Sequence, residues 1–267
     1  MNDHFTFING NFVPFNESTV HVSDLSIQRG YAVFDFFLVR NGVPPFLTFH
    51  MERLMNSVSL LKIELSYSKE ELSAIILELI KRNNHGNSSI KIIVTGGLSE
   101  DDFTLSSSSV IIINKPFEVP VTDATRNGGI LITTNYQRDI PEAKTINYIR
   151  SVSLSRQLIE KNAVEVLFLD RNWVRECSRS NVYMVKDKVV YTPKSKILKG
   201  VTKRRILSLE GFEVREKDFK FSDLLSADEV FITSTTKGVM PIRQIDSAVI
   251  ADGRVGNVTK AIQRQIM

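Results

Sequence analysis

Two prolines within six residues interrupt this chain near its middle and constrain its fold more than any other feature. The segment Lys115-Pro116-Phe117-Glu118-Val119-Pro120 follows a β-rich run, and the sequence after it repeats neither the order nor the composition of the first part. Proline fixes φ and removes a backbone donor, so such a stretch ends both helices and strands. In a chain of 267 residues, this predicts two domains, 1–115 and 121–267, with a linker at 116–120.

Hairpin and helix signals alternate before the linker. Asn9-Gly10 and Asn41-Gly42 each supply the two positive-φ residues of a type I′ turn, so each predicts a hairpin. Ser68 precedes an apolar pattern of helical period and can cap that helix. The expected elements are hairpins of 5–8 with 11–13 and of 33–39 with 45–49, helices at 51–63 and 67–82, and strands at 89–95 and 106–114.

The part after the linker mixes strands and helices without an internal repeat. The expected strands are 129–134, 164–169, 181–185, 188–191 and 229–233, and the expected helices are 147–161, 202–209 and 258–266. The fold class is therefore α/β (α+β): a small α+β domain followed by a larger, β-rich domain with flanking helices.

Composition excludes several classes of protein. The 34 basic and 30 acidic residues are spread along the chain without a basic block, so nucleic acid is not an expected partner. Cys177 is the single cysteine, which excludes an internal disulfide, and four scattered histidines lack the spacing of a metal site. No signal peptide is visible, and the apolar runs fall short of the ~20 residues of a membrane helix. We expect a soluble, cytoplasmic protein without a metal.

Three segments carry the residue types that hold pyridoxal phosphate. Lys144 opens the run Lys144-Thr145-Ile146-Asn147-Tyr148. Glu176 ends a further strand, which follows an expected turn at Asp170-Arg171-Asn172, and Gly200-Val201-Thr202 opens an expected helix. A lysine amine, a carboxylate for the pyridine nitrogen and backbone amides for the phosphate are what this cofactor needs. Each residue alone is typical of a solvated surface, and it is their order along the chain that makes the hypothesis.

The spacing resembles the class IV (fold-type IV) pyridoxal-phosphate aminotransferases, a family with branched-chain and D-amino-acid aminotransferases and aminodeoxychorismate lyase. The resemblance implies that Lys144 forms the Schiff base and moves the substrate's proton. It implies that Tyr148 hydrogen-bonds the phenolic oxygen, that Glu176 faces the pyridine nitrogen, and that Leu198 packs on the ring. Cys177 stands where most members have glycine, a variant that resembles some lyases.

The same resemblance implies a phosphate site. Arg53, in a His-x-x-Arg run, is similar to the family's phosphate-binding arginine, and hydroxyls and amides come from Gly200-Val201-Thr202 and Ser234-Thr235-Thr236. The implied cofactor-binding set is Arg53, Lys144, Tyr148, Glu176, Leu198, Val201, Thr202 and Thr235.

The substrate side departs from each known subgroup. Phe34, Phe36, Leu38 and Arg40 share one face of an expected strand, and similarity places that face toward the substrate. D-amino-acid enzymes have tyrosine at Phe34 and arginine at Gly96, the lyase has threonine at Phe36, and branched-chain enzymes have glycine at Phe36 and arginine at Leu38. The face therefore predicts an apolar, narrowed pocket.

The substrate carboxylate has a separate set of candidates. The turn Thr236-Lys237-Gly238 offers backbone amides, with Lys237 or Arg40 assisting, and Arg29 and Tyr31 are further candidates. The alternative for Lys237 is a solvated turn lysine.

The favoured function is transfer of an amino group between an amino acid, apolar or branched-chain-like, and a 2-oxo acid through a Lys144 aldimine. The resemblance also implies a homodimer, with the cofactor in the cleft between the domains. Two alternatives stay open: a lyase of the aminodeoxychorismate lyase type, and a degenerate protein that binds the cofactor without catalysis.

Overall fold

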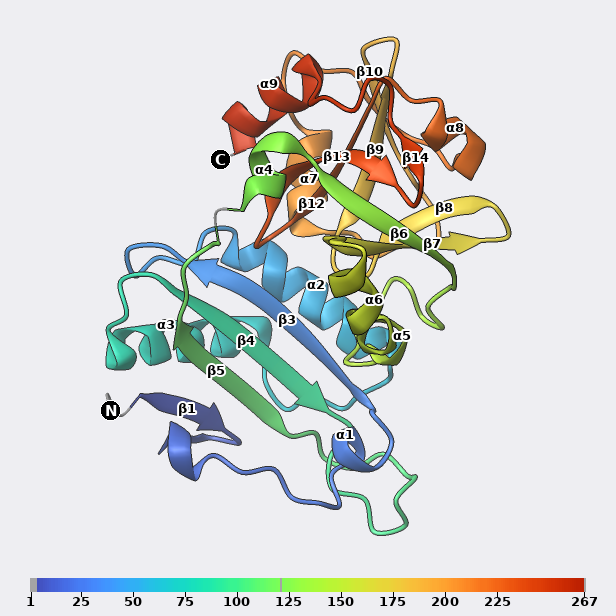
Figure 1. The fold of residues 1–267 in the computed structure, drawn as a ribbon. Coiled ribbons are helices and arrows are strands. Elements are labelled where there is room, and N and C mark those ends of the chain that lie inside the picture. The colour runs from blue at the N-terminus through green and yellow to red at the C-terminus, as the bar shows by residue number, and fades with distance from the viewer. Residues whose placement is uncertain (1–3, 121, 267) are drawn as a thin grey trace. The chain divides into compact units, whose positions relative to one another are not determined.

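The computed structural model describes residues 4–120 and 122–266 and separates into two compact units (Figure 1). The first unit comprises Met1–Glu118 together with Ala143–Asn147. The second comprises Val119–Glu142 and Tyr148–Met267. The chain therefore leaves the first unit, returns to it for five residues, and leaves it again between Asn147 and Tyr148.

In its described part, the first unit is a five-stranded sheet with two helices packed on one face. Every strand pair in it is antiparallel, in the order β2-β1-β5-β4-β3. The core between sheet and helices includes Phe37, Leu54 and Ile76. The elements are β1 (Phe5–Ile8), β2 (Asn11–Pro14), η1 (Phe15–Glu17), α1 (Leu25–Gln28), β3 (Ala32–Val39), α2 (Leu47–Leu60), α3 (Lys69–Asn83), β4 (Ser88–Thr95) and β5 (Val110–Pro116).

Local signals are confirmed at two places in this unit. Asn9 and Gly10 have φ of 44° and 94° and join β1 to β2, as a type I′ turn requires. The hydroxyl of Ser68 accepts a hydrogen bond from the Glu71 amide, and the Glu71 carboxylate accepts one from the Ser68 amide. This capping box satisfies two donors at the start of α3.

The predicted hairpin of 33–39 with 45–49 is wrong. The turn after β3 forms, with Arg40 and Val43 joined by backbone hydrogen bonds of 2.8 and 2.9 Å. The chain then enters α2 at Leu47, and β3 pairs with β4 over its whole length. Phe46, with φ of 60°, precedes the helix and has no polar side-chain atom to cap it, so no local start signal marks α2. Packing of α2 against the sheet decides the structure there.

The segment that carries Lys144 requires a correction to the predicted domains. We expected it in the C-terminal domain, but Ala143–Asn147 packs with the first unit. The reason is a short extension of the sheet: Thr145 bridges Val33, and the Phe34 amide donates to the Lys144 carbonyl at 2.8 Å. Lys144 is therefore attached to β3.

In its described part, the second unit is built on a nine-stranded mixed sheet, in the order β11-β10-β9-β12-β13-β6-β7-β8 with β14 beside β13. The β6–β7, β6–β13 and β10–β11 pairs are parallel, and the remaining pairs are antiparallel. The strands are β6 (Gly129–Asn135), β7 (Glu165–Asp170), β8 (Trp173–Cys177), β9 (Asn181–Lys186), β10 (Val189–Thr192), β11 (Val214–Glu216), β12 (Glu229–Ser234), β13 (Gly238–Ile245) and β14 (Ala248–Val249).

Short helices complete the second unit. They are α4 (Asp123–Asn127), α5 (Ile149–Ser153), α6 (Ser155–Glu160), α7 (Val201–Leu207), α8 (Phe221–Leu225) and α9 (Asn257–Ile266). The single helix predicted at 147–161 is therefore two helices that meet at Leu154. The strand predicted from residue 106 begins only at Val110.

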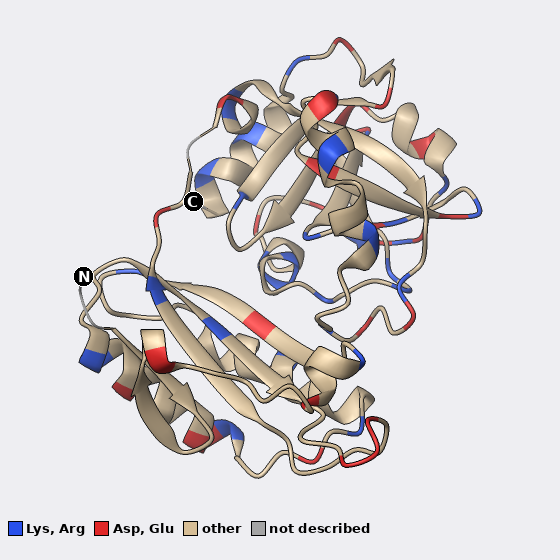
Figure 2. Cartoon of the chain, turned by 60° about the horizontal axis from the view of Figure 1, so that its bottom comes forward, with Lys and Arg blue, Asp and Glu red and all other residues tan. Residues whose placement is uncertain are grey.

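In the part of the chain that the structure describes, neither unit carries its charged residues as a block of one sign. Figure 2 shows basic and acidic residues interspersed on each unit. Within residues 4–120 and 122–266, no helix has the length and apolar character needed to cross a bilayer.

Candidate active site

A buried carboxylate organises the first-unit residues. Asp35 lies in the middle of β3 and is fully buried, on the strand face opposite Phe34 and Phe36. His50 and Arg53, one helical turn apart on α2, both contact it. His50 Nδ1 lies 2.8 Å from Asp35 Oδ1, while Arg53 donates from Nε to Oδ2 and from Nη2 to Oδ1, each at 2.8 Å. The His-x-x-Arg spacing thus places two partners on one carboxylate.

This contact fixes the charge of Asp35 and the orientation of Arg53. Burial pushes the pKa of Asp35 upward, but the Arg53 guanidinium and the His50 hydrogen bond outweigh it and hold that pKa well below its usual range. Asp35 therefore stays ionised and holds one edge of the guanidinium. The other edge carries the remaining N–H donors, which suit a phosphate or carboxylate. The structure thus gives Arg53 a partner that sequence reasoning missed.

Ser57 ties Lys144 to the same helix. Its hydroxyl donates to the Arg53 carbonyl at 2.9 Å and accepts a hydrogen bond from the Lys144 amide at 3.0 Å. With the Phe34 amide on the Lys144 carbonyl, the backbone of Lys144 is held on both sides. Two hydrogen bonds position this backbone, while the side chain is long and partly exposed.

The amine of Lys144 lies over an aromatic ring. Its Nζ is 4.5 Å from the ring centroid of Phe34, and Lys91 Nζ lies 5.3 Å from the same centroid. Phe36, on the same strand face, packs edge-on against Phe117 with 6.0 Å between ring centroids. The structure therefore brings Lys144 together with the aromatic part of the face predicted to meet the substrate.

The other first-unit residues that were expected to meet the substrate are less available for binding it. The Tyr31 hydroxyl donates to the Leu61 carbonyl at 2.7 Å, so it is engaged within the unit. Leu38 is buried, and Arg40 is exposed beyond the end of β3.

In the second unit, Glu176 is held in place by two groups. Arg138 donates to its Oε1 from Nε at 2.9 Å and from Nη2 at 2.6 Å. The Leu198 amide donates to its Oε2 at 3.0 Å. Arg138 Nη2 also contacts the Pro141 carbonyl. A carboxylate beside an arginine remains ionised and fixed, as an acceptor for a pyridinium N–H must be.

The loop that carries Leu198 is anchored by Asn181. Its Nδ2 donates to the Leu198 carbonyl at 2.8 Å, and a Cβ added at Gly200 would lie 2.2 Å from its Oδ1. Only glycine fits at position 200 while Asn181 stays where it is. Glu176 and Asn181 thus both act on the loop before α7.

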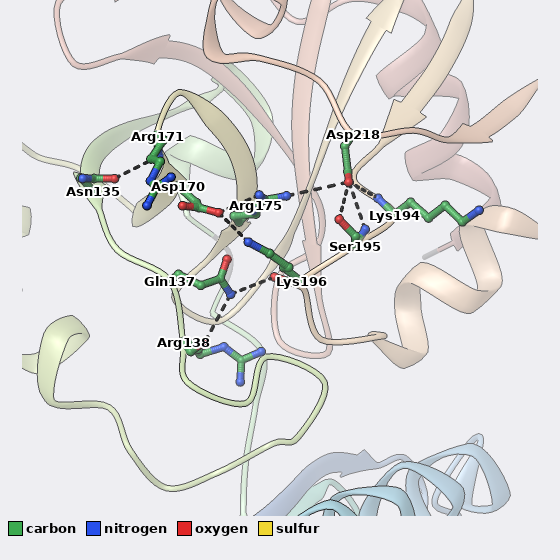
Figure 3. Close-up of polar contacts among 10 residues, drawn as sticks. All are labelled: Asn135, Gln137, Arg138, Asp170, Arg171, Arg175, Lys194, Ser195, Lys196 and Asp218. Carbon is green, nitrogen blue, oxygen red and sulfur yellow. Dashed lines mark hydrogen bonds and ion pairs between the residues drawn. The ribbon is translucent and has the colours of Figure 1, made fainter.

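Figure 3 shows a second anchor for this loop. The carboxylate of Asp218 accepts hydrogen bonds from the amides of Lys194 and Ser195, at 2.9 and 3.0 Å. Asp170 accepts one from Lys196 Nζ at 3.0 Å. Gln137, next to Arg138, donates to the Lys196 carbonyl at 3.3 Å, so the same loop is linked to the segment that carries Arg138.

Tyr148 and Cys177 share an environment that disfavours ionisation. Burial raises the pKa of Tyr148 to about 12, with Arg138, Glu176, Glu165 and Arg179 as the charges that act on it. The phenol therefore stays protonated near neutral pH and can donate a hydrogen bond. Burial also raises the pKa of the Cys177 thiol well above its ordinary value, so this cysteine is a packed, unreactive group.

The turn between β12 and β13 holds the last candidates. Thr235 and Thr236 are half-buried there. The Lys237 amide donates to the Ser234 hydroxyl at 3.2 Å, so that amide is used inside the turn. The Lys237 amine lies 2.6 Å from the buried carboxylate of Glu165. Lys237 is therefore paired, and the alternative of a solvated turn lysine is wrong.

Sequence reasoning missed Asp35, Ser57, Arg138, Glu165 and Arg179. The sequence could have indicated two of them. Asp35 and Glu165 are acidic residues in otherwise apolar strands, where a buried charge needs a partner.

These groups define the class of protein. Pyridoxal phosphate is held by a lysine amine, a fixed carboxylate, a protonated phenol and a cation with hydroxyl groups. The residues present fit that cofactor. Among residues 4–120 and 122–266, no group of three or more His, Cys, Asp or Glu could hold a metal ion.

Comparison with known proteins gives the family. Residues 32–245 match the family model for amino-transferase class IV, and the chain belongs to this family. A D-alanine aminotransferase of Listeria innocua is 33% identical, over 94% of this chain and 91% of the relative. The branched-chain amino acid aminotransferase of Escherichia coli superposes with a TM-score of 0.89 at 28% identity, covering 98% of this chain and 93% of the other. The T.th. branched-chain enzyme, solved with pyridoxamine 5′-phosphate, gives 0.89 and 28%, covering 99% and 93%.

The predicted family and fold are thereby confirmed. The chain is a pyridoxal-phosphate-dependent aminotransferase of class IV that acts on amino acids and 2-oxo acids.

Proposed function

We propose that this aminotransferase takes amino acids with apolar side chains as donors and that Lys144 is its catalytic residue. One observation carries the proposal: the Lys144 amine lies 4.5 Å from the ring centroid of Phe34, on the strand face that also presents Phe36. An amine over the ring of Phe34, on a strand face that also carries Phe36, suits a substrate whose side chain is apolar.

The other candidate residues are assigned roles toward the cofactor and the substrate. Bound pyridoxal phosphate supplies the electron sink for the substrate's Cα–H bond. The Lys144 amine would hold the cofactor until the substrate's amino group replaces it. The freed amine would then take the proton from the substrate's Cα and return it as general acid. Glu176 is fixed by Arg138 and the Leu198 amide and would accept a hydrogen bond from the pyridine nitrogen. Tyr148, which stays protonated, would donate one to the phenolic oxygen. Arg53, Val201, Thr202 and Thr235 would hold the phosphate, and Leu198 would pack on the face of the ring.

The test is a panel of L- and D-amino acids mixed with the holoenzyme. We expect leucine-like donors of one enantiomer to convert the visible absorption of the bound cofactor to that of the pyridoxamine form, and glutamate-like donors to react less. Lys144→Ala is expected to abolish this conversion. Lys91→Ala is the matched control, since its amine lies over the same Phe34 ring. Equal loss in both variants would contradict the assignment of Lys144.

A lyase assay and the amino-acid panel together separate the alternatives. Release of pyruvate from aminodeoxychorismate without an amino acceptor would establish the lyase, which the Glu176-Cys177 pair keeps open. A holoenzyme that reacts with no donor would support the degenerate binding protein.

We also infer a homodimer, with support from exposed apolar side chains on the first unit. Val22, Ile27, Leu98 and Phe103 are 68%, 60%, 50% and 80% exposed. Backbone contacts join their two loops, because Asp24 bridges Leu98. Light scattering should give twice the chain mass, and Phe103→Asp with Leu98→Asp should give the monomer. A cytoplasmic location stays a prediction, checked by cell fractionation.

A further inference from the structure

Glu165 is a fully buried carboxylate that faces two cations in the second unit. It begins β7, and its Oε1 lies 2.6 Å from Lys237 Nζ and 3.2 Å from Arg179 Nε. Its Oε2 accepts a hydrogen bond from the Arg179 amide at 3.2 Å and contacts the Ser178 hydroxyl. Both carboxylate oxygens are therefore satisfied by this cluster.

The charges in the cluster do not cancel. The cluster contains one carboxylate and two cations, so the net charge of the cluster is about +1 when all three groups are ionised. Burial pushes the pKa of Glu165 upward, but Lys237 and Arg179 outweigh burial and hold that pKa below its ordinary value, so the carboxylate is ionised. A single cation would neutralise Glu165, and a second is left over for an anion.

The three side chains of the cluster differ in their exposure to solvent. Glu165 is 0% exposed, Lys237 14% and Arg179 58%. The carboxylate thus lies at the base, with the guanidinium at the surface. Nε is the guanidinium atom nearest Glu165, and the Nη groups carry further N–H donors in a planar fork that matches a carboxylate.

Strand pairing places the two cations next to the cofactor residues of this unit. β9 and β12 pair with Asn181 opposite Thr233, so the turn before β9 and the turn after β12 are neighbours. Arg179 is in the first turn, three residues after Glu176. Lys237 is in the second turn, two residues after Thr235.

We propose that Arg179 and Lys237, held together by Glu165, bind the α-carboxylate of the amino acid and 2-oxo acid substrates. The proposal rests on the proposed function, in which both substrates carry that group. The proposal also revises the expectation that backbone amides of the turn bind the substrate carboxylate. The Lys237 amide already donates to the Ser234 hydroxyl within the turn, so the Lys237 side chain is the group that can bind the carboxylate. Glu165 acts as a positioning residue, since without it two like charges would repel each other.

The direct test measures binding of 4-methylvalerate, a branched carboxylate without an amino group, to the holoenzyme by calorimetry. Loss of a charge-assisted hydrogen bond should raise its Kd about tenfold or more in Arg179→Gln and in Lys237→Gln. Arg179→Lys should recover part of the affinity. Arg264→Gln, an exposed arginine on α9, is the matched control. Cofactor absorption confirms that each variant is loaded and folded.

A kinetic arm identifies which carboxylate is bound. In both glutamine variants we expect KM to rise by a similar factor for leucine and for glutamate, with little change in kcat. The amine isopentylamine has the leucine side chain without the carboxylate, so its KM should stay unchanged. A rise for glutamate alone would show that the pair binds a side-chain carboxylate and would overturn the proposal.

The remaining outcomes are also decisive. Unchanged Kd for 4-methylvalerate in both loaded variants would overturn the proposal and leave the two cations as structural partners of Glu165. A cofactor-loaded wild-type enzyme that converts no amino acid would instead overturn the proposed function. The Kd for 4-methylvalerate would still show whether Arg179 and Lys237 bind a carboxylate.

Discussion

Arg53 and Asp35 form a two-point ion pair inside the first unit, with Nε on Oδ2 and Nη2 on Oδ1, each at 2.8 Å. Asp35 is fully buried and the Arg53 side chain is 10% exposed. The pair joins β3 to α2, the two elements that also hold the backbone of Lys144. A single salt bridge therefore supports both the helix–sheet contact and the segment that carries the proposed catalytic lysine.

Asp35→Asn should be strongly destabilising. It keeps the side-chain shape but leaves the buried guanidinium without its counter-charge, and breaking a buried pair costs about 3–5 kcal/mol. The measurement is the free energy of unfolding of the holoenzyme in denaturant. Glu78→Gln is the control, because Glu78 and Arg82 form an exposed i,i+4 pair that contributes roughly 0.3–0.5 kcal/mol. Equal losses in the two variants would contradict the structural role of Asp35.

His50 should make the folded state sensitive to mild acid. Burial lowers its pKa from 6.5 and outweighs the opposing effect of Asp35. The unfolded chain therefore binds a proton at a higher pH than the folded chain does, so stability is retained above about pH 6.5 and falls as the pH decreases through the lower folded pKa. Asp35 has the same sign at lower pH, since its depressed pKa means that its contribution is lost below about pH 3.9.

The pH dependence is checked by unfolding at a series of pH values. Just below pH 6.5, the slope of unfolding free energy against pH should be smaller in His50→Gln than in the wild type, because glutamine does not titrate. Identical slopes would remove His50 as the titrating group.

Local signals made much of the fold predictable. The Asn9-Gly10 turn and the Ser68 cap each act within a few residues, so their effects can be read from the sequence. The failure at 45–49 has the opposite cause: Phe46 gives no start signal, and α2 exists because its apolar face is buried against the sheet. Helices that depend on packing are poorly marked by local sequence.

For the candidate site, the family motif names residues whose roles stay predictions, and it does not reveal the distant partners that position them. Lys144, Tyr148, Glu176 and Arg53 follow from the motif. Arg138 reaches Glu176 across 38 residues, and Lys237 reaches Glu165 across 72. Periodicity does not specify such pairs, because only the folded sheet brings the two strand ends together.

Arg138→Gln should weaken cofactor binding by releasing Glu176. The variant loses two charge-assisted hydrogen bonds to the carboxylate, so we expect the Kd for pyridoxal phosphate to rise about tenfold or more. The visible absorption of the bound cofactor should also shift, since Glu176 would no longer hold the proton on the pyridine nitrogen. Arg138→Lys should restore part of the affinity. The control is Arg171→Gln, because Arg171 is exposed and its backbone amide, not its side chain, contacts Asn135.

Gly200→Ala should disturb the loop before α7. The added Cβ would lie 2.2 Å from Asn181 Oδ1, so either Asn181 or the loop must move, and overpacking of this kind costs about 1–3 kcal/mol. Movement of Asn181 breaks its hydrogen bond to the Leu198 carbonyl, and movement of the loop draws the Leu198 amide away from Glu176. Both routes predict weaker cofactor binding. Gly86→Ala is the matched control, because a Cβ there meets no atom within 4 Å.

A double-mutant cycle shows whether Asn181 transmits the effect. Asn181→Ala alone should weaken cofactor binding by removing the anchor of the loop, and it also removes the atom that blocks a Cβ at position 200. Adding Gly200→Ala to Asn181→Ala should therefore cost much less than Gly200→Ala costs in the wild type, because contacting residues are not additive. The measurement is the Kd for pyridoxal phosphate in the four proteins. Additive losses would place the effect of Gly200 elsewhere, in the entry to α7, and would separate it from the anchor formed by Asn181.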